Sequence, residues 1–139
     1  MKCEKTFRFL SEIGNIEPVL DDVLSILNEH GIERKIAFKI RLVLEEIIVN
    51  VVSYAYGEGK GDVELRCAVE DDPKRLSFQI IDSGKPFDPT KVEEPDLDVP
   101  IEQRRIGGLG IFIVKSIMDE MVYERQDNQN ILTLKKRIG

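Results

Sequence analysis

Two neighbouring stretches of alternating residues restrict the fold of this chain most. Apolar side chains occupy every second position in residues 62–69 and again in residues 76–80. They are Val63, Leu65, Cys67, Val69, Leu76, Phe78 and Ile80. Such alternation places one face of a strand in the core, and residues 71–74, which include Pro73, are typical of a turn. We therefore predict a β-hairpin with one buried face over residues 62–80.

Three segments with helical spacing can cover that face. The first has Asn15 as its N-cap and Pro18 in its first turn, and it ends at Gly31. The second extends over residues 33–56 and the third over residues 109–121, each with an apolar stripe. Further strands are expected at residues 4–10, 122–125 and 131–136. These elements predict a two-layer α/β sandwich, in which a mixed, mostly antiparallel sheet of about five strands carries three helices on one face.

Length and charge narrow the class of protein. The 139 residues fit one domain over residues 1–139. A net charge of −6 argues against direct nucleic-acid or membrane-surface binding. Two cysteines and one histidine argue against a thiolate or imidazole metal site. No signal-peptide core and no apolar run of about 18 residues is present, so we expect a cytoplasmic protein.

The second helix carries a pair of polar side chains whose chemistry suits catalysis and metal binding. Glu46 and Asn50 are four residues apart, so they lie on one helix face. A carboxylate can accept a proton from an attacking hydroxyl, and an amide oxygen can bind Mg²⁺. A solvated polar face is the simpler interpretation of the pair taken alone.

Asp82 and Gly84 end the second strand of the predicted hairpin. A carboxylate there can accept a hydrogen bond from an adenine amino group, and a glycine lets a base lie against the backbone. An ordinary Asp-Ser-Gly turn is the alternative. The residues that follow, about 85–106, are rich in proline and charge, and such a long loop inside a compact domain is typical of a lid.

A glycine-rich segment joins this lid to the third helix. Gly107, Gly108 and Gly110 precede the apolar helical stretch, and Arg104 and Arg105 precede the glycines. Unpaired backbone N–H groups and the positive end of the helix dipole form a binding site for phosphates. The two arginines can add planar donors or can be solvated lid charges.

Taken in chain order, these motifs resemble the ATPase superfamily of gyrase B, histidine kinases and MutL, which has the Bergerat fold. The order is Glu-x-x-x-Asn on a helix, Asp-x-Gly after a strand, a lid, and Gly-Gly-x-Gly opening a helix. The segment from Gly107 to Lys115, followed by Asp119 and Glu120, is most similar to the small bacterial branch of anti-sigma factor serine/threonine kinases. The resemblance covers the chain from the first strand to Lys136.

This resemblance implies an ATP- and Mg²⁺-dependent protein serine/threonine kinase that acts as an anti-sigma factor through partner switching. It identifies Glu46 as the general base, Asn50 as the Mg²⁺ ligand and Asp82 as the adenine-binding aspartate, with Gly84 beside it. The implied partners are a sigma factor and its anti-sigma factor antagonist, with a homodimer as the implied assembly.

The same resemblance identifies Gly107, Gly108 and Gly110 as the phosphate-binding glycines. Arg105 is a candidate ATP contact because it precedes these glycines and carries planar donors. The resemblance also places Thr133 near the adenine. The chain departs from the superfamily at Pro86, which replaces a second glycine and stiffens the start of the lid.

Three other functions are compatible with the sequence. The first is a nucleotide-gated binding module that sequesters a regulatory protein without phosphoryl transfer. The second is a detached ATPase domain that phosphorylates a histidine elsewhere, and the third is a structural domain without a ligand. ATP binding without a phosphoprotein product would favour the binding module. Acid-labile rather than acid-stable phosphate on a partner would favour the histidine-directed ATPase domain. Absence of nucleotide binding would favour the structural domain.

Overall fold

The computed structural model describes residues 2–71, 74–91 and 108–138. The strands are β1 (Lys2–Leu10), β2 (Asp62–Glu70), β3 (Arg75–Asp82), β4 (Glu120–Gln126) and β5 (Gln129–Arg137). The helices are α1 (Ile16–Glu29), α2 (Arg34–Asn50) and α3 (Gly108–Ile117), with 3₁₀ turns η1 (Ile13–Asn15) and η3 (Pro89–Lys91) and a π-helical turn η2 (Val51–Ala55).

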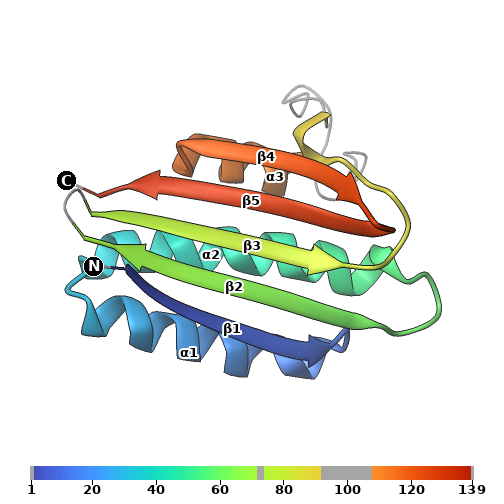
Figure 1. The fold of residues 1–139 in the computed structure, drawn as a ribbon, viewed down its shortest axis with the longest axis horizontal. Helices are drawn as coiled ribbons and strands as arrows, with labels where there is room; N and C mark the ends of the chain where they lie inside the picture. The colour runs from blue at the N-terminus through green and yellow to red at the C-terminus, as the bar shows by residue number, and fades with distance from the viewer. Residues whose placement is uncertain (1, 72–73, 92–107, 139) are drawn as a thin grey trace.

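The five strands form one sheet in the order β1-β2-β3-β5-β4, and every neighbouring pair is antiparallel. All three helices lie on the same face of this sheet (Figure 1). Helix α2 packs between α1 and α3. The predicted two-layer α/β fold is therefore confirmed. Asp72 and Pro73 of the predicted hairpin turn lie outside the described residues.

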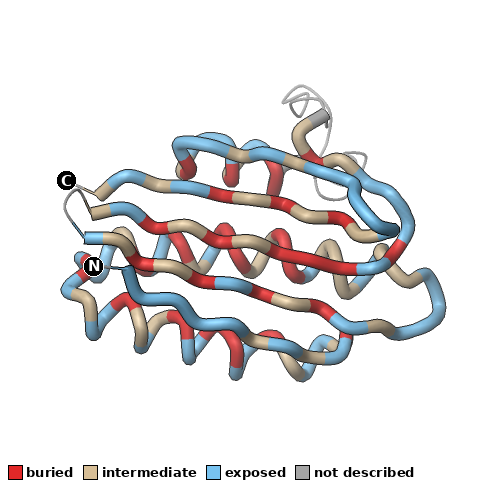
Figure 2. The backbone as a smooth tube through the Cα atoms, viewed as in Figure 1, coloured by how far each residue is buried: buried red, intermediate tan, exposed pale blue. Residues whose placement is uncertain are grey.

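The core fills the space between the sheet and the helices. Alternate residues of β2 and β3 point into it, and Figure 2 shows this as buried positions that recur along each strand. The helices contribute side chains that are fully buried, among them Leu20, Leu27, Ile40, Leu44 and Ile48. Each such side chain stabilises the fold by about 1.5–3 kcal/mol relative to an exposed one.

The predicted second helix, residues 33–56, is not α-helical over its whole length. The α-helical part ends at Asn50, and Val51–Ala55 form a π-helical turn instead of continuing the same geometry. A π turn accommodates one more residue than an α turn and often marks a functional site. As a result, Tyr54 and Ala55 line a cavity at the end of the sheet.

Two other predicted boundaries differ from the structure. The third helix ends at Ile117 rather than at residue 121, and β4 already begins at Glu120. The backbone N–H of Asp119 donates to Lys135 O at 2.9 Å, and Lys136 Nζ donates to Ile117 O at 2.8 Å. Pairing with β5 therefore ends the helix, because the strand partner satisfies groups that a longer helix would use.

The N-terminus of α1 also differs in detail. Asn15 stands at the N-cap position, but its side chain makes no cap hydrogen bond there. Its Nδ2 donates to Leu10 O at 3.0 Å instead and holds the end of β1. Among the described residues, no helix is long and apolar enough to cross a membrane.

Candidate functional site

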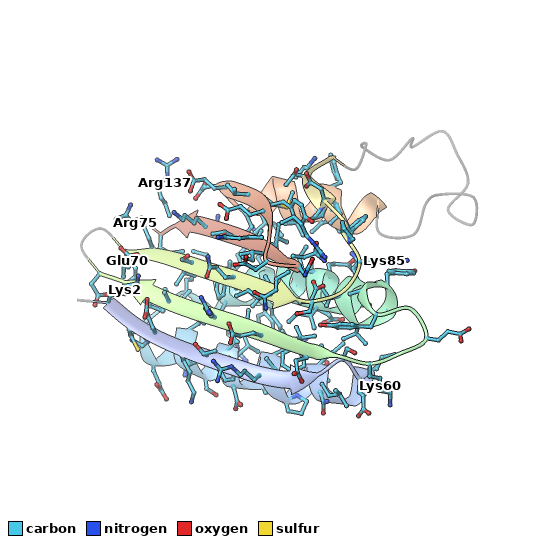
Figure 3. The ribbon with its side chains drawn as sticks, turned by 45° about the vertical axis from the view of Figure 1, so that its right-hand side comes forward. Lys2, Lys60, Glu70, Arg75, Lys85 and Arg137 are labelled. Carbon is cyan, nitrogen blue, oxygen red and sulfur yellow. The ribbon has the colours of Figure 1, made fainter. Side chains whose placement is uncertain are left out.

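A cavity of about 470 Å³ opens at one end of the sheet, where β3 and β5 meet α2, the π turn and the loop after β3. Lys85 in that loop lies at the end of the molecule opposite Lys2 and Arg137 (Figure 3). The volume falls within the range of about 300–1,000 Å³ that small-molecule sites occupy. Its apolar walls include Ile47, Ile80, Ile111 and Leu132.

Asp82 is the buried carboxylate of this cavity. It ends β3 and is 5% exposed. Its Oδ1 accepts hydrogen bonds from the backbone N–H of Gly84 and from Asn130 Nδ2, both at 2.9 Å. Its Oδ2 makes no hydrogen bond with the described residues. A fixed acceptor in an apolar wall can orient a ligand that carries an N–H donor.

Gly84 holds the loop against the π turn. A Cβ atom at this position would lie 2.6 Å from Ala55 Cβ and would overlap the Ala55 carbonyl. The next residue, Lys85, donates its backbone N–H to Ala55 O at 2.9 Å. Gly84 therefore permits a close backbone packing. It is not among the residues that line the cavity, so its predicted contact with a base stays a prediction.

Asn50 lines the same cavity from the last position of α2. It is half-buried, and its side chain makes no hydrogen bond with the described residues. Asn50 and Asp82 are 32 positions apart in the chain, and the fold brings them to one cavity. An amide oxygen that no described residue binds is a suitable ligand for a hard cation.

Glu46 lies one helical turn before Asn50 and is half-buried. Its carboxylate contacts Gly110 in the first turn of α3, because a Cβ on Gly110 would overlap Glu46 Oε2 and lie 2.8 Å from its Cδ. The first N–H groups of a helix lack intrahelical partners and carry partial positive charge. The structure therefore places the Glu46 carboxylate beside the positive end of α3.

The glycine-rich segment is described only in part. Gly108 begins α3 and Gly110 follows in its first turn. Gly107, Arg104 and Arg105 lie outside the described residues, as does most of the predicted lid. Of that lid the structure describes residues 85–91, which end in η3. Lys115 on α3 is exposed and donates to Thr90 O at 3.0 Å.

Thr133, which the resemblance places near the adenine, lies away from this cavity. Thr133 points to the outer face of the sheet, where its Oγ1 accepts a hydrogen bond from Gln79 Nε2 at 3.2 Å. It lines a separate polar groove on that face. Its neighbours Leu132 and Leu134 point into the core. The alternation of these leucines with Thr133 is a sequence signal for the outward orientation.

Asn130 is the site residue that sequence reasoning missed. It lies opposite Asp82 in the β3–β5 register, is 7% exposed and lines the cavity. Tyr54 and Tyr123 also line it.

Tyr56 does not line the cavity but joins the start of β2 to the loop after β3. It donates its hydroxyl to Asp62 O at 2.6 Å and accepts from the Ser83 N–H at 2.8 Å. Burial raises the pKa of Tyr56, so its hydroxyl stays protonated and can make both bonds.

The fold and the cavity agree with one family of domains. The chain belongs to the histidine kinase-like ATPase domains, whose family model matches residues 9–136. It is similar to a serine/threonine-protein kinase, BtrW, of Bordetella bronchiseptica, at 28% identity over 72% of this chain and 70% of that protein. It is also similar to the serine-protein kinase RsbW of Bacillus cereus, at 26% identity over 68% of this chain. That alignment spans 61% of the RsbW protein's length.

Two solved structures share the fold. One contains the RsbU and RsbW domains of a Mycobacterium tuberculosis protein, with a TM-score of 0.69, 15% identity, and coverage of 97% of this chain and 32% of that one. The other is the SiaB-SiaC complex of Pseudomonas aeruginosa, with a TM-score of 0.59, 18% identity, and coverage of 96% and 89%. At these identities the likeness supports the architecture alone.

Proposed function

We propose that this chain is an ATP- and Mg²⁺-dependent protein serine/threonine kinase that acts as an anti-sigma factor. One observation carries the proposal: Asn50 and Asp82 line one cavity, and Glu46 lies one turn from Asn50 beside the start of α3. A kinase of this kind needs a group that recognises the adenine, a metal ligand near the phosphates and a proton acceptor for the attacking hydroxyl. The kinase names of the two sequence relatives support the same function.

The cavity suits the base of the nucleotide. Apolar side chains from α2, β3, α3 and β5 form its walls and can cover the faces of a purine. Asp82 would accept a hydrogen bond from the 6-amino group of adenine. This contact would distinguish adenine from purines without an amino group at that position.

Asn50 is the residue that would hold Mg²⁺. It fits the ion because its amide lines the cavity and has no hydrogen-bond partner among the described residues. The ion would bring positive charge to the phosphates of ATP.

Glu46 would act as the general base. It would accept the proton of a serine or threonine hydroxyl on the antagonist protein while the hydroxyl oxygen attacks the γ-phosphorus and ADP leaves. The N–H groups at the start of α3 would stabilise negative charge on the transferred phosphoryl group. The sigma factor, the antagonist and the homodimer stay predictions from the resemblance.

Replacement of Glu46 by glutamine tests this role. Glu46→Gln keeps the shape of the side chain and removes the proton acceptor, so we expect nucleotide affinity to change little and phosphoryl transfer to fall by about 100-fold or more. The measurement is ATP-dependent formation of acid-stable phosphoprotein on a purified antagonist, with nucleotide binding measured in parallel. Glu45→Gln is the matched control, because Glu45 immediately precedes Glu46 in α2 and pairs with Arg41 at 3.0 Å instead.

The results separate the alternatives. Unchanged transfer by Glu46→Gln would remove the general-base assignment. ATP binding by the wild-type protein without any phosphoprotein would favour the nucleotide-gated binding module. Acid-labile phosphate on the partner would favour a histidine-directed kinase.

A further inference from the structure

Three neighbouring strands bring their polar residues together at the cavity. Asn130 is the register partner of Asp82 across β3 and β5, and of Arg125 across β4 and β5. Tyr123, two residues before Arg125 on β4, also lines the cavity. These residues are far apart in the sequence from Asp82, and only sheet pairing places them at its side.

The side-chain amide of Asn130 has one orientation that satisfies its neighbours. Its Nδ2 donates to Asp82 Oδ1 at 2.9 Å and to Lys85 O at 2.8 Å. Its Oδ1 accepts from the Tyr123 hydroxyl, and from Arg125 Nη1 at 3.2 Å. Exchange of the oxygen and the nitrogen would place an amide donor against the Arg125 donor and an amide oxygen against the oxygens of Asp82 and Lys85, so these three neighbours fix the orientation of the amide.

This orientation determines how Asp82 presents its carboxylate. Two N–H donors, from Gly84 and Asn130, bind the same oxygen, Oδ1. They stop the carboxylate from rotating and occupy one of its oxygens. The other oxygen, Oδ2, has no partner among the described residues and is available to a ligand in the cavity.

Arg125 extends the network to the loop after β3. Its Nη1 donates to Gly84 O at 2.7 Å as well as to Asn130. The loop backbone is thus tied to β4 by Arg125, to β5 by Asn130 and to the π turn through Ala55. Asp82 and the first residues of the loop are held as one unit before any ligand binds.

We propose that Asn130, hydrogen-bonded to Tyr123 and Arg125, is a positioning residue that aims Asp82 at the 6-amino group of adenine and thereby sets the preference for adenine nucleotides. Asn130 acts through Asp82 and is not itself the group that reads the base. This role rests on the proposed nucleotide-binding function. It gives residues of β4 and β5 a part in the nucleotide specificity of the site.

The test compares ATP with purine riboside triphosphate, which lacks the 6-amino group. We expect the wild-type protein to bind ATP at least about 10-fold more tightly, which is the size of effect that one buried hydrogen bond has. In Asn130→Ala the carboxylate of Asp82 loses one of the two donors that hold it, and we expect this preference to fall to about 3-fold or less. Dissociation constants for both nucleotides, measured by calorimetry, give the ratio directly.

Two further variants keep the test decisive. Arg125→Met changes an exposed residue and retains its aliphatic stem, so it tests the network if Asn130→Ala does not fold; we expect a smaller loss of preference in the same direction. Thr133→Val lies three residues after Asn130 on β5 and points to the outer face, so both dissociation constants should stay unchanged.

Each negative result of the nucleotide-binding test leads to a different conclusion. If the variants lose affinity for both nucleotides by the same factor, Asn130 has only a structural role and the inference is overturned. A wild-type protein that binds both nucleotides equally well also overturns it, although the proposed nucleotide site survives. If the wild-type protein binds neither nucleotide, the proposed function itself fails.

Discussion

Gly110 is the residue whose size matters most for the proposed chemistry. Its missing side chain leaves room for the Glu46 carboxylate beside the first turn of α3. Among the described residues, the three atoms nearest to a Cβ at this position all belong to the flexible side chain of Glu46. A larger residue would therefore move the carboxylate and leave the fold in place.

We predict that Gly110→Ala reduces phosphoryl transfer without unfolding the protein. Alanine in a helix is favoured over glycine by about 1 kcal/mol, so the free energy of unfolding should be unchanged or slightly higher. Transfer should fall by at least about 10-fold, because small displacements of reacting groups have large effects on rate. Thermal unfolding and the phosphorylation assay measure the two effects.

Gly14→Ala serves as the control, since a Cβ at Gly14 meets no atom within 4 Å. It should leave transfer unchanged. Full activity in Gly110→Ala would show that the position of Glu46 beside α3 is not needed for the reaction.

The hairpin between β4 and β5 determines the register that places Arg125 beside Asn130. Its two connecting residues, Asp127 and Asn128, have φ values of 53° and 63°. A two-residue loop with both residues left-handed matches the twist of the strands that it connects. Asn and Asp tolerate this conformation better than most residues, whereas a β-branched side chain does not.

We predict that Asn128→Val lowers the free energy of unfolding by about 1–2 kcal/mol, because valine is strained at positive φ. Asn128→Gly is the matched variant and should be neutral or slightly stabilising. Urea denaturation of both variants measures the difference. Equal stabilities for the two variants would contradict the left-handed turn.

The whole molecule protects one of its two thiols. Cys3 is exposed on the edge strand β1, and Cys67 is buried in the core at 3% exposure. Burial raises the pKa of Cys67 to about 12, so almost none of this thiol ionises near neutral pH. Because the thiolate is the reactive form, Cys67 should react only when the fold opens.

We predict that a disulfide reagent labels Cys3 quickly and Cys67 slowly in the native protein. Because a ligand at 100 times its dissociation constant stabilises the fold by about 2.7 kcal/mol, ATP should slow labelling of Cys67 by about 100-fold. The Cys3→Ser variant isolates the Cys67 signal. Equal labelling rates for both thiols would contradict the buried position of Cys67.

The sequence alone determined the features that depend on local periodicity. Alternation in residues 62–69 and 76–80 identified the two central strands and their buried faces, because a strand repeats every two residues whatever its partners are. Helical spacing identified the three helices in the same way. The order of the Glu46, Asn50 and Asp82 motifs indicated the family, since such motifs keep their order when the rest of a sequence changes.

Only the tertiary structure decided which side chains meet. Asn130 lies beside Asp82 because of strand register, and a shift by one residue would send it to the other face. The π turn after Asn50 leaves the apolar pattern of α2 intact, so periodicity alone does not reveal it. The contact between Glu46 and Gly110 depends on how two helices pack. Such contacts join positions far apart in the chain, and their energy comes from packing and pairing that no local pattern encodes.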